Sequence, residues 1–376
     1  MIRTQPSTAA LTSLEAALAI LLEGLAPVAP SFVPLELALG CIGAAMPPLA
    51  NALPARDTAK TDGWAFRALD LAGASTYSPL PLLALPPWVD AGAPMPQGCD
   101  CILEAGLVDV SGPMAQVFGE APPGQGVRRA GEDIGADRPL VIAGERLCAA
   151  DLLVAQSAGV AEIAVRAPHI RMLNIAAPTG ETLTARFMAD CARACGAVVG
   201  DIETVVRDAT SLAGALDSRG GDLVILVGGT GAGRADVVAE ALGACGALLA
   251  HNVALEPGRT AAIGRLDSIP VVALPGAPDQ AFAAFLALVQ PVLDRLSARS
   301  ARRGVILPLA RKISSTVGVA EIVLLKQEQD SWGLLAIGDF SLEAMRSADA
   351  WLAISASSEG YAAGTPVRAF LVNDPR

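Results

Sequence analysis

DLVILVGGTGAGRADVV, residues 222–238, is the stretch that decides how the rest of the chain is interpreted. Its five-residue apolar run, Leu223–Val227, predicts a buried strand, and a helix-like pattern begins after the glycine-rich segment GGTGAG. Glycines allow positive φ and a close approach of the backbone to a ligand, and N–H groups at the start of a helix favour an anion. The stretch therefore predicts a phosphate cradle, with an ordinary strand-to-helix turn as the alternative. The residues that it nominates for ligand binding are Gly228, Gly229, Thr230, Gly231 and Gly233.

Composition excludes several classes of protein. The chain has 376 residues, of which 52% are hydrophobic, and its mean hydropathy is +0.48. No apolar run approaches the roughly 18 residues that a membrane-spanning helix needs. The first thirty residues read as an amphipathic helix and not as a signal peptide, so we expect a cytoplasmic protein. The net charge of −11, without a basic block, argues against nucleic acid and against an anionic membrane as partners.

Cysteine and histidine usage limits the chemistry further. The seven cysteines are scattered, and none of their spacings matches a zinc site. Buried reduced thiols are the interpretation that we favour. Two histidines exclude a histidine-rich metal centre, and no GxSxG segment supports a serine nucleophile.

Strands alternate with helices after residue 169, which predicts a mostly parallel sheet with helices on both faces. Ligands of such sheets bind at the carboxyl ends of the strands. The expected strands are 170–176, 198–204, 223–227, 261–263 and 271–274, and the expected helices are 183–194, 210–218, 235–244 and 279–296.

The remainder of the chain reads as smaller β-rich pieces. A proline- and glycine-rich stretch predicts a small inserted β-domain, and the tail predicts a small β-barrel or sandwich. We expect an α/β multidomain chain with four domains: a discontinuous linker and dimerisation domain (1–50 and 140–168), the inserted β-domain (51–139), the α/β domain (169–300) and the C-terminal β-domain (301–376).

Four short segments outside the glycine-rich stretch carry candidate chemistry. Asp62 precedes a glycine at the start of the inserted domain, where an Asp-Gly turn is the alternative. Glu181 follows the first strand of the α/β domain, where helix capping is the alternative. Arg259 follows a proline–glycine turn and suits an oxyanion. The segment that holds Pro275, Gly276 and Pro278 forms a second such turn.

The joint order of these segments is more specific than any one of them. TDGWAFR, DAGAPMPQGCD, RRAGEDI, APTGE, VGGTGAGRADVV, ALEPGRTAAIG and ALPGAP follow one another along the chain. This order resembles the MoeA and gephyrin E-domain family of molybdenum cofactor biosynthesis, from about residue 11 to residue 373. The GGTG loop is similar to that of the related MogA-type proteins. The resemblance implies a homodimer whose α/β domain binds molybdopterin.

The resemblance also implies a reaction and its residues. Adenylylated molybdopterin would receive molybdenum from molybdate, with Mg²⁺ as the cation and with release of AMP. Glu181, Asp222 and Asp236 would hold the cation and, with Asp62, take part in catalysis. The glycine loop, Arg259, the turn at 275–278 and Ser341 of the C-terminal domain would hold the substrate.

Four positions depart from the family pattern and keep two alternatives open. Ala91, Thr182, Glu256 and Val319 stand where the family has a threonine, an acid, a lysine and an arginine. The first alternative is therefore a non-catalytic molybdopterin carrier or assembly factor that would meet a MogA-like protein or a molybdoenzyme apoprotein. The second, suggested only by the GGTG loop, is an adenylyltransferase.

Overall fold

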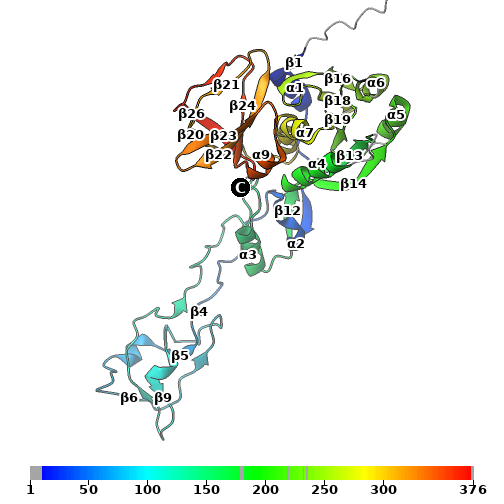
Figure 1. Ribbon diagram of the computed structural model, residues 1–376. Coiled ribbons are helices and arrows are strands. Elements are labelled where there is room, and N and C mark those ends of the chain that lie inside the picture. Colours follow the sequence, from blue (N-terminus) through cyan, green and yellow to red (C-terminus); the bar gives the residue numbers. More distant parts are fainter. Residues whose placement is uncertain (1–10, 178–181, 218–219, 232, 234–235, 374–376) are drawn as a thin grey trace, which may run out of the picture. The chain divides into compact units, whose positions relative to one another are not determined.

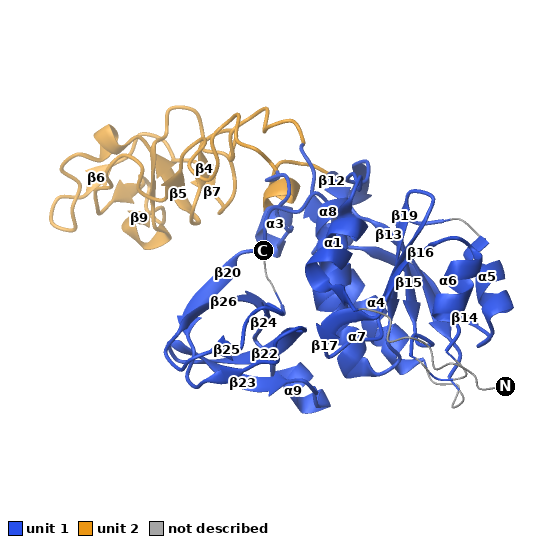
Figure 2. Cartoon of the chain, turned by 90° about the horizontal axis from the view of Figure 1, so that it is seen from above, with its two compact units in different colours: residues 1–45, 141–152, 162–376 blue, residues 46–140, 153–161 orange. Residues whose placement is uncertain are grey.

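The computed structural model describes residues 11–177, 182–217, 220–231, 233 and 236–373. The chain forms two compact units, coloured separately in Figure 2. Unit 1 comprises Met1–Ala45, Val141–Leu152 and Glu162–Arg376, and unit 2 comprises Met46–Leu140 and Leu153–Ala161. Most of unit 2 coincides with the β-domain that the sequence predicts at 51–139. The finer division into four domains stays a prediction.

A six-stranded sheet forms the centre of unit 1 (Figure 1). Its order is β14-β13-β15-β19-β18-β16; the first four strands are mutually parallel, and β18 is antiparallel to both of its neighbours, β19 and β16. The prediction of a mostly parallel sheet is therefore confirmed. The strands are β13 (His169–Ile175), β14 (Val198–Val205), β15 (Leu223–Val227), β16 (Leu248–His251), β18 (Ala262–Leu266) and β19 (Ile269–Leu274).

Helices cover both faces of this sheet, because successive side chains of a strand point to opposite faces. In β15, Ile225 packs into one hydrophobic cluster and Leu226 into the other. Helices α4 and α7 belong to the first cluster, and α5 and α6 to the second. Burial on both faces explains why the strand reads as an uninterrupted apolar run. The helices are α4 (Leu183–Ala194), α5 (Ala209–Asp217), α6 (Val238–Ala244) and α7 (Pro278–Ala284).

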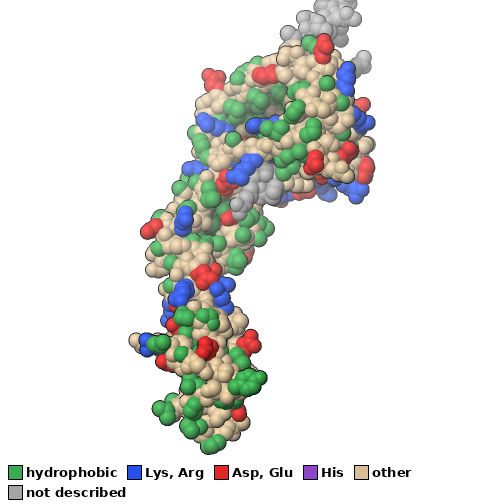
Figure 3. Space-filling model, turned by 90° about the vertical axis from the view of Figure 1, so that its left-hand side faces the viewer, with side chains coloured by type: hydrophobic (Ala, Val, Ile, Leu, Met, Phe, Trp, Pro, Cys, Tyr) green, Lys and Arg blue, Asp and Glu red, His purple; other side chains and the backbone are tan. Residues whose placement is uncertain are grey.

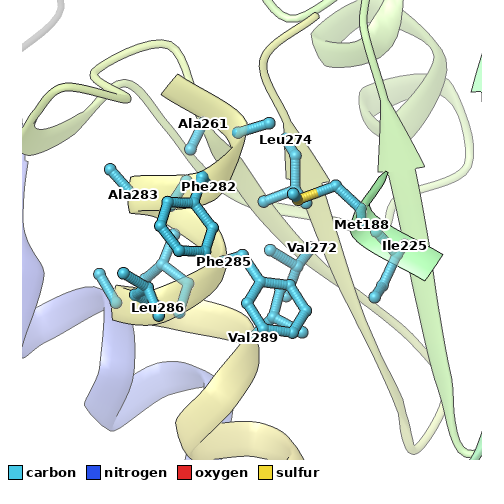
Figure 4. Close-up of a cluster of buried hydrophobic side chains, with 14 of the residues drawn as sticks. Met188, Ile225, Ala261, Val272, Leu274, Phe282, Ala283, Phe285, Leu286 and Val289 are labelled. Atoms are coloured by element: carbon cyan, nitrogen blue, oxygen red, sulfur yellow. The ribbon is translucent and has the colours of Figure 1, made fainter. Parts of the chain in front are cut away.

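Aromatic rings fill the first cluster. Figure 4 shows Phe282 and Phe285 packed near Val272, Leu274 and the side chain of Met188. The helix expected at 279–296 is continuous, but a π-helical turn, η3 (Phe285–Val289), joins α7 to α8 (Gln290–Leu296). This packing holds α4 and α7 against the sheet.

A second sheet, of seven strands, includes the C-terminal part of the chain. Its order is β1-β17-β22-β24-β26-β20, with β23 paired to β22. Strand β17 lies parallel to both β1 and β22, so the segment that precedes Arg259 belongs to this sheet and not to the central one. The strands are β1 (Thr12–Ser13), β17 (Val253–Glu256), β20 (Gly304–Pro308), β22 (Ala320–Glu328), β23 (Ser331–Ile337), β24 (Ala350–Ile354) and β26 (Pro366–Leu371).

Shorter elements complete unit 1. Helix α1 (Leu14–Leu22) begins after Ser13, whose hydroxyl caps it by accepting a hydrogen bond from the N–H of Ala16. A three-stranded sheet has the order β2-β12-β3. The other elements are α2 (Leu35–Ala38), α9 (Leu342–Ser347), β2 (Ser31–Pro34), β3 (Ile42–Gly43), β12 (Glu162–Arg166), β21 (Ile313–Ser314) and β25 (Gly360–Tyr361), and helix α3 (Ala149–Ser157) contains residues of both units.

Unit 2 is built from short strands around two small cores. Its sheets have the orders β7-β5-β8, β6-β10-β9 and β11-β4. Its elements are β4 (Thr58–Ala59), β5 (Gly63–Phe66), η1 (Ala68–Leu71), β6 (Leu80–Pro81), β7 (Trp88–Val89), β8 (Cys101–Leu103), η2 (Ala105–Leu107), β9 (Val108–Asp109), β10 (Gln116–Val117) and β11 (Val127–Arg128).

The surface agrees with the composition. On the face that Figure 3 shows, acidic and basic side chains are interspersed. Among the helices that the structure describes, none is both long and apolar enough to cross a bilayer.

Candidate functional site

A cavity of about 390 Å³ lies at the carboxyl ends of β13, β15 and β19. Its volume is in the range of small-molecule sites. The site pocket, as we call it, is lined by Asn174, Ile175, Ala177, Leu183, Thr184, Arg207, Val227, Gly228, Gly229, Thr230, Gly231, Asp236, Thr260, Pro275, Gly276, Ala277, Pro278 and Gln280.

The glycine segment forms one rim of the site pocket with its backbone. Gly228 and Gly229 have φ of +90° and +67°, a conformation that side chains disfavour. Among the described residues, no backbone carbonyl accepts a hydrogen bond from the N–H groups of Gly229, Thr230 or Gly231. Successive N–H groups without partners form an anion-binding concavity. The phosphate cradle predicted from the sequence therefore has the geometry to hold an anion.

Asp236 stabilises the glycine segment and the position of Arg207 through its two carboxylate oxygens. One carboxylate oxygen lies 2.7 Å from the guanidinium of Arg207, and the other accepts a hydrogen bond of 2.7 Å from the N–H of Gly233. A Cβ at Gly231 would lie 2.6 Å from the same carboxylate, and one at Gly233 would lie 2.9 Å from it. A methyl group at either position would therefore have to displace the carboxylate. Asp236 thus holds the loop in shape and places Arg207 at the pocket.

Thr230 links the glycine segment to two other parts of unit 1. Its hydroxyl lies 3.1 Å from the hydroxyl of Thr260, and its carbonyl lies 2.8 Å from Nε2 of His251. Thr230 itself is only 3% exposed. The loop is therefore anchored on the side of β16 and on the segment that follows β17.

The turn after β19 closes the opposite rim. Gly276 approaches the glycine segment so closely that a Cβ on it would lie 3.5 Å from the Cα of Gly228. The N–H of Gly228 donates to the carbonyl of Leu274, and the hydroxyl of Thr184 donates to the carbonyl of Gly276 at 2.7 Å. These bonds fix the turn at Pro275–Pro278 against β15 and the start of α4.

Asn174 is a polar residue that the sequence analysis did not nominate. It is the second-to-last residue of β13, lines the site pocket and is 5% exposed. Its Nδ2 is buried and has no hydrogen-bond partner among the described residues. Buried polar atoms of proteins rarely lack a hydrogen-bond partner.

Eight of the nominated residues meet in the site pocket: Gly228, Gly229, Thr230, Gly231, Asp236, Pro275, Gly276 and Pro278. Gly233 adjoins it through its bond to Asp236. The structure also brings in five polar residues that the sequence analysis missed: Asn174, Thr184, Arg207, Thr260 and Gln280. Arg207 had a detectable signal, because it follows a predicted parallel strand at its carboxyl end.

Asp222 lies at the other end of its strand. It precedes β15, and its carboxylate accepts a hydrogen bond of 2.8 Å from the N–H of His169, at the amino end of β13. Six residues at about 3.3 Å each place it roughly 20 Å from Gly228. Asp222 therefore does not lie at the site pocket, and the prediction that it holds a cation there together with Asp236 is wrong.

Arg259 and Ser341 lie outside the lining of the site pocket. The Arg259 guanidinium is 3.2 Å from the carboxylate of Glu256, and both side chains are substantially exposed. Ser341 caps α9, where its hydroxyl accepts a hydrogen bond from the N–H of Ala344. Arg259 nevertheless precedes Thr260, which does line the pocket.

Two other nominated residues are not placed at the pocket. Asp62 belongs to unit 2, where its carboxylate accepts a hydrogen bond of 2.7 Å from the N–H of Ala91. This bond joins two segments 29 residues apart, and Gly63 begins β5, so Asp62 is not simply part of an Asp-Gly turn. Glu181 lies outside the described residues.

The described residues do not form a cation site of the kind that the sequence predicts. Within them, no group of three or more His, Cys, Asp and Glu side chains is arranged to hold a metal ion. Asp222 is remote from Asp236, whose carboxylate is already engaged by Arg207 and Gly233. Glu181, the third residue nominated for the cation, lies outside the described residues, so the Mg²⁺ site stays a prediction.

The cysteines are free thiols. Burial raises the pKa of Cys191 to about 12 and, in unit 2, that of Cys101 to about 11. Thiols with raised pKa values stay protonated and unreactive at neutral pH. The cysteines are reduced, as expected, but only Cys101 is fully buried, and the other six are partly buried.

Two family models match the chain. A model described as "MoeA N-terminal region (domain I and II)" matches residues 12–159, and one described as "Probable molybdopterin binding domain" matches residues 179–295. The glycine segment and the turn after β19 lie within the second match.

Several curated proteins are similar along much of the chain. "Molybdopterin molybdenumtransferase 2" of Mycobacterium tuberculosis is 30% identical over 306 residues, which cover 70% of this chain and 74% of that protein. "Molybdopterin molybdenumtransferase" of Synechococcus elongatus is 29% identical over 84% of this chain and 88% of its own length.

A solved structure is similar over nearly the whole chain. The molybdopterin biosynthesis MoeA protein of Pyrococcus horikoshii has a TM-score of 0.70 and 26% sequence identity, and the similarity covers 96% of this chain and 99% of that one.

Proposed function

This chain belongs to the MoeA family of molybdenum cofactor biosynthesis, and on that premise we propose that it is a molybdopterin molybdenumtransferase. The reaction would insert molybdenum from molybdate into adenylylated molybdopterin and release AMP. The observation that carries the proposal is the row of N–H groups at Gly229, Thr230 and Gly231, which have no hydrogen-bond partner among the described residues and lie in one cavity with Arg207.

The chemistry of this rim suits a phosphate. Backbone N–H groups cost no reorganisation on binding, and a guanidinium supplies charge and several donors. Arg207 is held beside the rim by Asp236, so its position does not depend on the ligand. In a chain whose net charge is −11, local groups of this kind are needed to attract an anion.

Molybdate would need a second cationic position. Arg259 is the residue that the family resemblance assigns to it, next to Thr260 of the site pocket. Glu256 now forms an ion pair with Arg259, so an incoming oxyanion would compete with a carboxylate for the guanidinium. This competition predicts weak molybdate binding, which Glu256→Lys should strengthen.

The proposal also includes Mg²⁺ as the cation, a homodimer and protein partners. The described residues supply no set of ligands for Mg²⁺, so the requirement for the ion is left to the assay below. A homodimer is supported by exposed apolar side chains on neighbouring elements of unit 1, since exposed patches of this kind mark interfaces. They are Phe32, Leu37, Leu39 and Ile142, with exposures of 60% or more. A MogA-like protein or a molybdoenzyme apoprotein as partner, and a cytoplasmic location, stay predictions.

The deciding experiment follows AMP release from adenylylated molybdopterin by the purified full chain, with and without molybdate and with and without Mg²⁺. Binding of molybdopterin and of AMP is measured in the same preparation. Molybdate-dependent AMP release is the expected result. Failure to bind either ligand would refute the proposal.

Binding without AMP release would instead support a carrier or assembly factor. In that case the substituted positions are the cause, and the double variant Ala91→Thr with Glu256→Lys should restore release. Formation of adenylylated molybdopterin from ATP would support the adenylyltransferase.

A further inference from the structure

We propose that Asn174 is a specificity-determining residue of the site pocket, whose carboxamide pairs with the lactam edge of a pterin ring. The inference rests on the proposed function and assigns the two walls of the pocket to different parts of the substrate. It starts from the buried Nδ2 of Asn174, which lacks a partner among the described residues.

Strand geometry shows which wall Asn174 belongs to. Ile170 and Met172 of β13 pack into the cluster that contains α4 and α7, whereas Leu173 and Ile175 pack into the cluster that contains α5 and α6. Because alternate residues of a strand share a face, Asn174 lies on the side of α4 and α7.

The wall on that side has no charged residue among the described residues that line the pocket. Besides Asn174 its polar lining residues are Thr184, from α4, and Gln280, from α7. The charged lining residues, Arg207 and Asp236, precede α5 and α6 on the other side. One wall therefore suits the phosphate, and the other suits a neutral ring with hydrogen-bonding edges.

A carboxamide matches a lactam edge because each presents a donor next to an acceptor. Asparagine recognises the edges of nucleobases in the same two-bond manner. Asn174 is the register partner of Val227 on the adjacent strand β15, and Val227 directly precedes Gly228. Neighbouring strands are about 4.8 Å apart, so a ring paired with Asn174 would lie next to an anion held by the glycine segment.

The test compares binding of molybdopterin and of AMP, both measured anaerobically by calorimetry, to the full chain and to Asn174→Leu. Loss of the paired hydrogen bonds should weaken molybdopterin binding about tenfold and leave AMP binding unchanged. The melting temperature of the unliganded variant should stay the same or rise, because an unsatisfied buried group has been removed. Asn174→Val, with a side chain that strands favour, serves if the leucine variant does not fold.

Thr204→Val is the matched control. Thr204 lies directly beside Asn174 on β14 but does not line the pocket, so its loss should change neither affinity.

The outcomes separate the inference from the proposed function. Unchanged molybdopterin binding in the Asn174 variants, or equal weakening of molybdopterin and AMP, would overturn the role of Asn174 and leave the function standing. A fall in the melting temperature with both affinities intact would make Asn174 structural and would also overturn it. A wild-type chain that binds neither ligand would overturn both.

Discussion

The ion pair between Arg207 and Asp236 should be measurable as a coupling energy that holds the glycine segment closed. The perturbation is a double-mutant cycle of Asp236→Asn, Arg207→Gln and both together. The two charges are 2.7 Å apart at their nearest atoms, and the side chains are 26% and 15% exposed. Two unit charges 4 Å apart interact by about 1 kcal/mol in water and about 4 kcal/mol near a protein surface of lower dielectric. Partial exposure places this pair between those limits, at about 2 kcal/mol.

Hydrogen exchange gives the assay a local readout. The N–H of Gly233 is bonded to Asp236, that of Asp236 to the carbonyl of Gly233, and that of Val238 to the carbonyl of Gly229. These amides exchange when the loop opens. A coupling of about 2 kcal/mol corresponds to roughly a 30-fold change in their exchange rate at fixed conditions.

A second ion pair in the same domain provides the control. Arg193 and Asp190 are 2.9 Å apart but are 48% and 74% exposed, so their coupling should not exceed about 0.5 kcal/mol. If the effects of Asp236→Asn and Arg207→Gln simply add in the double variant, the pair does not hold the loop and our account of this rim is incorrect.

Three further predictions concern single residues. Gly231→Ala should weaken AMP binding by about tenfold or more, because its methyl group would displace the Asp236 carboxylate 2.6 Å away. Gly243→Ala is the control, because Gly243 has open space around it and its substitution should leave AMP binding unchanged. Equal AMP affinities of the two variants would contradict the prediction. Asp222→Asn should leave AMP release unaffected and lower the free energy of unfolding by about 1 kcal/mol, because its carboxylate bonds only at the amino end of the sheet; a large loss of turnover would return Asp222 to the site. The pKa of the Cys191 thiol is raised by burial to about 12, so the unfolded chain releases this proton from near pH 9 while the folded chain retains it, and stability falls as pH rises above 9. Between pH 8 and pH 10.5 Cys191→Ala should therefore lose about 2 kcal/mol less than the wild type in calorimetry, and identical losses would disprove the assignment.

The elements of the central sheet were predictable because their signals are local. Helix α4 begins and ends where the sequence predicts, at Leu183–Ala194, and β15 coincides with the apolar run Leu223–Val227. A strand buried on both faces must be apolar throughout, whatever the rest of the chain does. Strand β16 was not anticipated, because its partly exposed residues lack that pattern.

The sequence already contained the information that excludes Asp222 from the site pocket. The residue precedes its strand, and in a parallel sheet that position is the amino end, away from the ligand. Only the assignment by family resemblance placed it in the site. The strand direction, which the sequence already contains, contradicts that assignment.

The sequence by itself determined the fold class and the glycine-rich rim of the site pocket, because glycine conformations and apolar runs act over a few neighbouring residues. The tertiary structure alone decided which side chains meet around that rim. Arg207 comes from the end of β14, Thr260 from the segment after β17, and Asn174 from β13. Their convergence depends on strand order and on which face of the sheet each side chain takes. Those are set by packing between segments far apart in the chain, so no local pattern reports them.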